Sequence, residues 1–163
     1  MFSLAEVYDL GIRIEKNGEK FYRDALNQAW SKPIADMLKL LADEEAKHVD
    51  FFVRRMDALK QKRENPLLDE MGASMLKDIL GNQTFSLKDT DVSKFRSVEE
   101  LVGVAIEFEK DTILFYEMIG SFMTGEDARR ELTEIIEEEE RHVRLFESYG
   151  DKGIHLKSLD DRP

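Results

Sequence analysis

The chain has 163 residues, of which 42% are hydrophobic, so it is long enough to form one domain around a single hydrophobic core. Its 35 acidic residues outnumber its 24 basic residues and give a formal net charge of −11, which opposes binding to nucleic acids and to anionic membrane surfaces. It has no cysteine, which excludes disulfide bonds, thiolate-bound zinc, iron–sulfur clusters and cysteine nucleophiles, so any metal must bind through oxygen and imidazole ligands.

Apolar residues are spread along the chain rather than gathered in long runs. No stretch approaches the roughly 18 uncharged apolar residues of a membrane span, and we expect a soluble, cytoplasmic protein. Only three prolines occur, Pro33, Pro66 and Pro163, and between them apolar residues recur at helical spacing. The sequence therefore predicts an all-α fold.

Two long helices are predicted in the first part of the chain. Ser3 and Glu6 have the spacing of a capping box and mark the start of the first helix, which should end within residues 27–31. Pro33 suits the first turn of a second helix, which should continue to about Lys62.

A long connection, residues 63–96, follows the second helix. It contains one short amphipathic segment, about residues 69–80, and is far longer than a turn between two antiparallel helices requires. We therefore expect a crossover that returns the chain along the bundle, so that the second and third helices run parallel.

Two further helices are predicted after the crossover. The third starts at Ser97, where Glu100 completes another capping box, and ends within residues 120–124. The fourth runs from about Glu126 to Tyr149 and is closed by Gly150. Residues 1–150 are therefore predicted to form one four-helix bundle, and residues 151–163 a loosely held C-terminal tail.

The two helical pairs repeat each other. A shift of 94 positions, with no gap, superimposes the following residues: Ser3 on Ser97, Glu15 on Glu109, Tyr22 on Tyr116, Glu45 on Glu139, and His48 on His142. The sequence thus predicts two helical hairpins of one design, packed about an approximate two-fold axis.

One acidic residue lies midway along the mostly apolar face of each predicted helix. The four residues are Glu15, Glu45, Glu109 and Glu139. In a bundle these midpoints share one level, so four carboxylates would meet in a small volume with little water. Unpaired buried ions are costly, and no lysine or arginine occupies that level of the four faces. Two divalent cations would cancel the four negative charges.

Two histidines lie beside these acids. Glu45 and His48 are three residues apart, as are Glu139 and His142, which places each pair on one helical face where it can bind one cation. A single Glu-x-x-His pair is usually part of a solvated face. Two such pairs together with four acids at one level instead predict a dinuclear metal site. Within the run 137–140, only Glu139 is expected to point inward.

Four segments around these residues resemble the rubrerythrin-like branch of the ferritin-like di-iron carboxylate superfamily. They are IEKNGEKFY at 14–22, DEEAKH at 43–48, FEKDTILFY at 108–116 and EEEERH at 137–142. The resemblance covers residues 3–149 and implies a ferritin-like four-helix bundle of two hairpins.

The resemblance also implies a role for each residue of the predicted site. Glu15 and Glu109 would each bind one metal ion, Glu45 and Glu139 would bridge the two ions, and His48 and His142 would each add a nitrogen. Open coordination positions would remain for oxygen or peroxide. Two iron ions are expected, although manganese, a mixed iron–manganese pair or substituting zinc would fit the same ligands.

Four further residues near the predicted site are ambiguous. Tyr22 and Tyr116 lie two turns beyond Glu15 and Glu109, respectively. Their hydroxyls could hydrogen-bond to carboxylates, or the rings could simply pack in the core. Gly11 and Gly18 are interpreted mainly as tolerated helix positions, with close approach of a neighbouring helix or small oxidant as the alternative.

The resemblance implies a di-iron oxidoreductase that reduces hydrogen peroxide, or oxidises ferrous iron with dioxygen or peroxide, in protection against oxidative stress or free iron. A non-catalytic iron-binding or delivery module is the alternative, and a metal-free structural bundle is a third. The family also suggests a homodimer.

The chain departs from the family pattern in two respects. Thr112 stands where strongly peroxidatic rubrerythrins carry an extra carboxylate, which puts the metal movement associated with that residue in doubt. The cysteine-ligated rubredoxin module of full-length rubrerythrins has no counterpart, so electrons would come from a separate donor such as a rubredoxin-like protein.

Overall fold

A computed structural model of the chain describes residues 4–28, 30–61, 87, 90–121 and 125–151. These residues form four long α-helices and a short 3₁₀ helix: α1 Leu4–Leu26, α2 Lys32–Gln61, η2 Val92–Lys94, α4 Val98–Gly120 and α5 Glu126–Asp151. The described ranges contain no strand, which confirms the all-α prediction. None of the helices they contain is long and apolar enough to cross a membrane.

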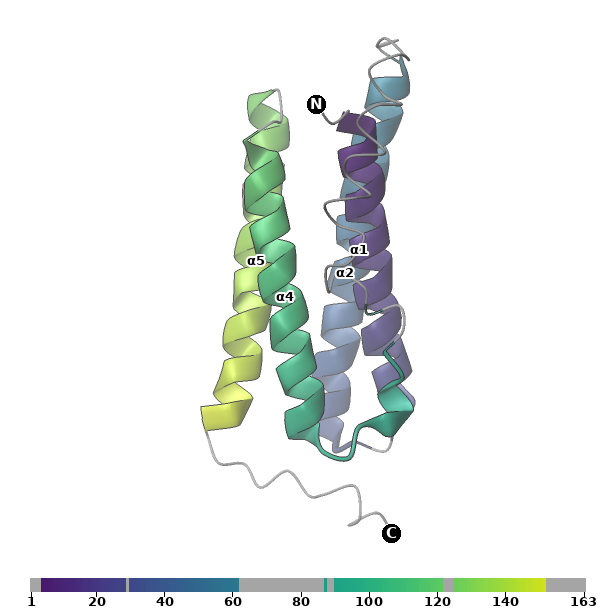
Figure 1. The fold of residues 1–163 in the computed structure, drawn as a ribbon, viewed down its shortest axis with the longest axis vertical. Coiled ribbons are helices and arrows are strands. Elements are labelled where there is room, and N and C mark those ends of the chain that lie inside the picture. The colour runs from purple at the N-terminus through teal and green to yellow at the C-terminus, as the bar shows by residue number, and fades with distance from the viewer. Residues whose placement is uncertain (1–3, 29, 62–86, 88–89, 122–124, 152–163) are drawn as a thin grey trace.

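The helices form two antiparallel hairpins that pack side by side into a four-helix bundle (Figure 1). The first hairpin consists of α1 and α2, and the second of α4 and α5. The ribbon colours show that α2 and α4 run in the same direction, as the length of the connection between them predicted. The short helix expected at about residues 69–80 and residues 152–163 of the expected tail lie outside the described residues.

The predicted helix boundaries lie close to the observed ones, but the residue expected to close α5 does not do so. Gly150 was expected to close that helix, but α5 includes Gly150 and continues to Asp151. The described glycine with a left-handed backbone is instead Gly125, at φ 103°, which directly precedes α5. Because Gly150 lies inside α5 and not after its last residue, the expectation that it closes the helix was wrong.

The start of α4 is capped by Ser97. Its extended backbone, at φ −143° and ψ 162°, directs the side-chain Oγ to accept a hydrogen bond from the Glu100 amide at 3.2 Å. The Glu100 carboxylate accepts from the Arg96 amide at 2.8 Å, one residue beyond the reciprocal bond of a capping box. The corresponding box predicted at Ser3 lies outside the described residues.

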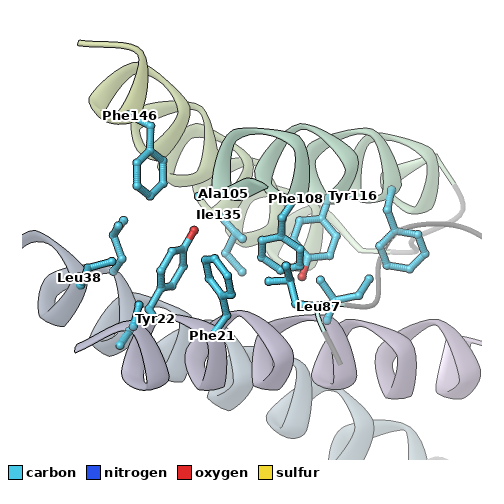
Figure 2. Close-up of a cluster of buried hydrophobic side chains, with 14 of the residues drawn as sticks. Phe21, Tyr22, Leu38, Leu87, Ala105, Phe108, Tyr116, Ile135 and Phe146 are labelled. Atoms are coloured by element: carbon cyan, nitrogen blue, oxygen red, sulfur yellow. The ribbon is translucent and has the colours of Figure 1, made fainter. Parts of the chain in front are cut away.

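Aromatic rings join the two hairpins through the core (Figure 2). Tyr22 of α1 stacks on Phe146 of α5 with ring centroids 6.1 Å apart, and Tyr116 of α4 packs against Phe52 of α2 at 5.3 Å. All four rings are fully buried. These two contacts are related by the 94-residue shift, so the repeat found in the sequence is also a repeat of packing between the hairpins.

The Ser97 cap makes a measurable contribution to stability. Because Ser97→Ala removes the acceptor for a free amide of the first turn, we expect it to lower the free energy of unfolding by about 1 kcal/mol in urea titrations. Gly103→Ala in the same helix is the control, since a Cβ there meets nothing within 4 Å and alanine is the better helix former. That variant should be more stable than the wild type, and a Ser97→Ala protein of unchanged stability would contradict the capping role.

Candidate metal centre

Polar side chains occupy the middle of an otherwise apolar core. The described residues include seven buried polar ones: Glu15, Glu45, His48, Glu109, Thr112, Glu139 and His142. The Thr112 hydroxyl donates to the Phe108 carbonyl of its own helix at 2.9 Å and is thereby satisfied. The other six are the residues that the sequence predicted to converge, and the structure brings all six together, one acid from each helix.

The six side chains form two overlapping groups of possible ligands. The first group comprises Glu15, Glu45, His48 and Glu139, and the second comprises Glu45, Glu109, Glu139 and His142. Within each group the four candidate ligand atoms lie within 4.8 Å of one another. Because Glu45 and Glu139 belong to both groups, the arrangement offers two adjacent candidate cation positions that would share these two carboxylates.

Eight buried atoms of this cluster have no hydrogen-bond partner: Oε2 of Glu15 and Glu109, both carboxylate oxygens of Glu45 and Glu139, and Nδ1 of His48 and His142. Some lie very close together, such as His48 Nδ1 and Glu139 Oε1 at 2.9 Å, but without hydrogen-bond geometry. Each unsatisfied buried polar atom costs about 1–3 kcal/mol. Bound cations would satisfy all eight atoms, so the donor set fits a dinuclear site.

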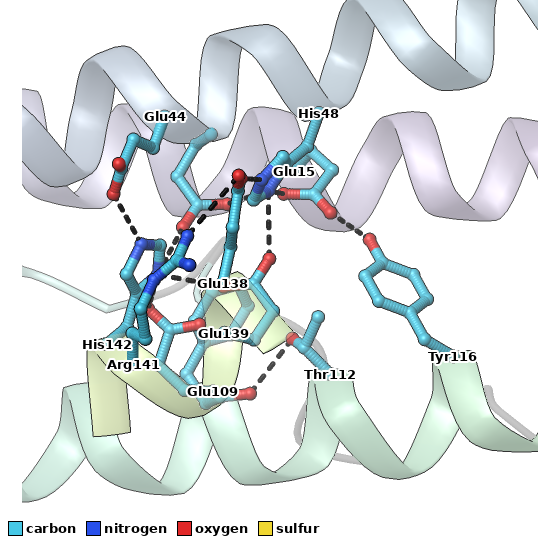
Figure 3. Close-up of polar contacts among 12 residues, drawn as sticks. Glu15, Glu44, His48, Glu109, Thr112, Tyr116, Glu138, Glu139, Arg141 and His142 are labelled. Atoms are coloured by element: carbon cyan, nitrogen blue, oxygen red, sulfur yellow. Dashed lines mark hydrogen bonds and ion pairs between the residues drawn. The ribbon is translucent and has the colours of Figure 1, made fainter. Parts of the chain in front are cut away.

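Each histidine is oriented by a carboxylate from the opposite hairpin (Figure 3). His48 Nε2 lies 2.7 Å from an oxygen of Glu138 on α5, and His142 Nε2 lies 2.7 Å from an oxygen of Glu44 on α2. A carboxylate accepts, so Nε2 carries the proton in each ring. The Nδ1 atoms are left facing the cluster, where a neutral imidazole presents a lone pair to a cation.

Sequence reasoning missed Glu44 and Glu138. The run 137–140 was expected to turn only Glu139 inward, yet the Glu138 side chain is only 34% exposed and Glu44 only 23%. Each directly precedes a shared acid, which places it about 100° around its helix, at the boundary with the neighbouring helix. Their equivalence under the 94-residue shift was the available signal, because it marks a repeated acid next to each inward one.

The outer acids are oriented by tyrosines from the opposite hairpin. Tyr22 of α1 donates to Oε1 of Glu109 on α4. Tyr116 of α4 donates to Oε1 of Glu15 on α1, as Figure 3 shows. Burial and the neighbouring carboxylates raise the pKa of both phenols well above 10.0, so both keep the proton they donate. Each bond leaves Oε2 of the outer acid unpaired and facing the cluster.

The acids of the cluster differ in proton affinity. Burial and the charge of Glu139 raise the pKa of Glu45 well above its ordinary value, and the same two causes raise the pKa of Glu109 to about 8. Burial also acts on Glu139, but the adjacent imidazoles of His142 and His48 outweigh it and lower the pKa of that acid. Glu139 therefore carries the most persistent negative charge of these three.

The imidazoles hold protons strongly when carboxylates are their only neighbours. Burial lowers the pKa of His48, but the charge of Glu15 and contacts with other glutamates outweigh it and raise the pKa well above 6.5. The same opposition raises the pKa of His142 to about 12, with Glu109 as the leading partner. The protein's own groups can therefore balance the buried charge by retaining protons, which a cation would have to displace.

The comparisons with known proteins agree with this fold. The family model described as rubrerythrin matches residues 6–149 of the chain. Among solved structures, a ferritin-like diiron-carboxylate protein from Thermotoga maritima is similar, with a TM-score of 0.69 and 23% sequence identity over 90% of this chain and 93% of that chain. At this identity the likeness shows the fold alone. No curated protein sequence matches the chain.

Loss of the carboxylates behind the histidines should weaken metal binding. Glu44→Ala and Glu138→Ala each leave a buried Nε2–H without an acceptor and free the ring to turn, so we expect roughly 10- to 100-fold lower affinity for a divalent cation by chelator competition. Glu44→Gln and Glu138→Gln keep an acceptor oxygen and should lose less. Glu137→Ala, an exposed acid on the same helix as Glu138, is the control and should bind like the wild type.

Metal binding should release protons at pH 7. The raised pKa values of Glu45, Glu109, His48 and His142 mean that these groups are largely protonated before a cation replaces the protons, so affinity should rise with pH and fall as pH is lowered. A pH indicator in weakly buffered solution measures the release when Zn²⁺ is added. Affinity that is independent of pH between 6 and 8 would contradict this protonation pattern.

Proposed function

The chain belongs to the rubrerythrin family, and we propose that it is a di-iron oxidoreductase that reduces hydrogen peroxide or oxidises ferrous iron with dioxygen or peroxide. The observation that carries the proposal is the pair of overlapping ligand groups that share Glu45 and Glu139. Carboxylate and imidazole ligands suit iron, and also manganese or zinc. Iron is favoured because the matching family model is rubrerythrin, and the sequence resembles the rubrerythrin-like branch of the di-iron carboxylate proteins.

The charge of the centre supports two cations rather than one. The four buried carboxylates carry four formal negative charges, and the described core contains no buried lysine or arginine to balance them. Two divalent ions neutralise the four charges and leave both histidines neutral and able to ligate. A single ion would leave two of these charges to be neutralised by protons retained on the ligands, and a protonated ligand cannot bind a metal ion.

The number of ligands supports chemistry at the metals rather than a purely structural role. Each group supplies four candidate ligand atoms, fewer than octahedral coordination provides. Positions would therefore remain for a small oxidant. When bound, two ferrous ions would supply the two electrons that, with two protons, convert hydrogen peroxide to two molecules of water.

The residues around the ligands would hold this centre rigid and dry. The phenols of Tyr22 and Tyr116 restrain the outer carboxylates, and the rings of Phe52 and Phe146 pack against those phenols and exclude water. The chain has no cysteine with which to hold a rubredoxin-type iron. We therefore propose that a separate electron donor, such as a rubredoxin-like protein, returns the oxidised centre to the ferrous state.

Rapid mixing of the iron-loaded, reduced protein with each oxidant tests the proposal. We expect oxidation to appear as an ultraviolet absorbance increase in stopped-flow records with hydrogen peroxide, dioxygen or both. Faster reaction with peroxide would identify a peroxidase, and faster reaction with dioxygen a ferroxidase. A protein that binds two iron ions but reacts with neither oxidant would be an iron-binding or delivery module, and the oxidoreductase proposal would be wrong.

Matched variants assign the reaction to the centre. Glu139→Ala removes a carboxylate shared by both groups and should abolish rapid oxidation together with stoichiometric iron binding. Glu140→Ala removes the next acid along α5, which is exposed and pairs with Arg144, and should react like the wild type.

A further inference from the structure

Gly18 is a buried glycine inside α1, one turn after Glu15. Glycine weakens a helix relative to alanine, so its presence at a buried interior position needs a reason in the packing. A Cβ at Gly18 would lie 3.0 Å and 3.1 Å from ring carbons of Phe108 and 3.2 Å from Oε2 of Glu45. The interpretation of Gly18 as a tolerated helix position is therefore wrong, because a ring and a carboxylate fill the space of its missing side chain.

Glu45 is the acid of the cluster that polar contacts restrain least. The outer acids each accept a hydrogen bond from a tyrosine, and Glu139 has an imidazole nitrogen 2.9 Å from one oxygen and another 2.8 Å from the other. Both oxygens of Glu45 lack a hydrogen bond, and its nearest imidazole nitrogens are 3.6 Å and 4.0 Å away. Apart from the Glu15 carboxylate and any bound cation, the atoms packed around Glu45 therefore restrict where its carboxylate lies.

The two-fold repeat is broken at this position. The 94-residue shift places Gly18 on Thr112, so the same level of α4 carries a full side chain, which is occupied by its bond to the Phe108 carbonyl. The two hairpins supply equivalent ligands but different surroundings for them. The bare backbone beside Glu45 is therefore a specific feature of the first hairpin.

We propose that Gly18 is a positioning residue for the metal centre. Its bare backbone leaves the space in which the Glu45 carboxylate lies, between the two cation positions. This inference rests on the two-cation site of the proposed function and does not depend on which oxidant that site uses.

Cobalt binding to the full chain tests this role without any redox chemistry. Gly18→Ala places a methyl group against Glu45, so we expect about 10-fold weaker Co²⁺ binding than in the wild type and a changed visible absorption spectrum of the bound Co²⁺. The spectrum reports the geometry of the ligands and would not respond to a general loss of stability.

Gly11→Ala is the matched control in the same helix. Its Cβ would meet the Phe52 ring at 2.9 Å, a clash at least as severe, but the nearest atoms there include no carboxylate. Because Phe52 also packs against Tyr116, which restrains Glu15, we expect Gly11→Ala to lower the melting temperature but to weaken Co²⁺ binding less than Gly18→Ala does. Equal effects of the two substitutions on Co²⁺ binding would overturn the positioning role of Gly18.

Substitution of Phe108 separates the ring contact from the carboxylate contact. In Gly18→Ala/Phe108→Leu the ring clash is relieved and the clash with Glu45 stays, so the weak binding should persist. Full recovery of affinity would overturn the proposal. If Gly18→Ala does not fold, the double variant is compared with Phe108→Leu alone, which should bind Co²⁺ like the wild type, and equal affinities of these two proteins would overturn the proposal.

The wild-type result separates this inference from the proposed function. A wild-type protein that binds fewer than two Co²⁺ ions would overturn both. Two bound ions with no effect specific to Gly18→Ala would overturn the positioning role alone. A Gly18-specific effect in a protein whose iron form is inert to oxidants would support the positioning role and remove the oxidoreductase proposal.

Discussion

The structure depends on the burial of four carboxylates and two imidazoles at one level of a helical bundle. Such a cluster is unfavourable unless its charge is balanced, because desolvation penalises each ion and like charges repel one another. The described core contains no buried lysine or arginine that could balance it. Desolvation and repulsion between the carboxylates raise the pKa of Glu45 and Glu109. The eight buried atoms without a hydrogen-bond partner all belong to this cluster. A bound pair of cations would balance the charge and pair these atoms.

The support for this cluster passes between the hairpins. Each outer acid accepts its hydrogen bond from a tyrosine of the other hairpin, and each histidine is held by a glutamate of the other hairpin. Neither hairpin therefore contains an oriented half of the centre by itself. Association of the hairpins and alignment of the ligands are one event, which links the stability of the bundle to the geometry of the site.

The symmetry of the centre is a property of its ligands and not of everything around them. The 94-residue repeat pairs every candidate ligand, the two tyrosines, and Glu44 with Glu138. It pairs Gly18, however, with Thr112. One shared acid thus lies against bare backbone, whereas the equivalent level of the other hairpin carries a side chain. Two cation positions with the same ligand types consequently have different surroundings.

Sequence alone determined the features that follow from helical periodicity. Inward acids such as Glu15 and the three-residue spacing of Glu45 and His48 are properties of a single helix, so they predicted which side chains converge. The length of the connection likewise predicted that α2 and α4 run parallel. The ends of the helices do not follow from this periodicity. Gly150 was expected to close α5, but the helix continues to Asp151.

Only the tertiary structure decided which residues hold the ligands in place. Glu44 and Glu138 lie where two helices meet, and the packing of the neighbouring helix decides whether such an acid is solvated or bonded to a histidine. The reason for Gly18 was also hidden, because the atoms that fill its space come from α2 and α4. Such contacts depend on the distance and rotation between helices, and these are set by the whole core rather than by the spacing within one helix.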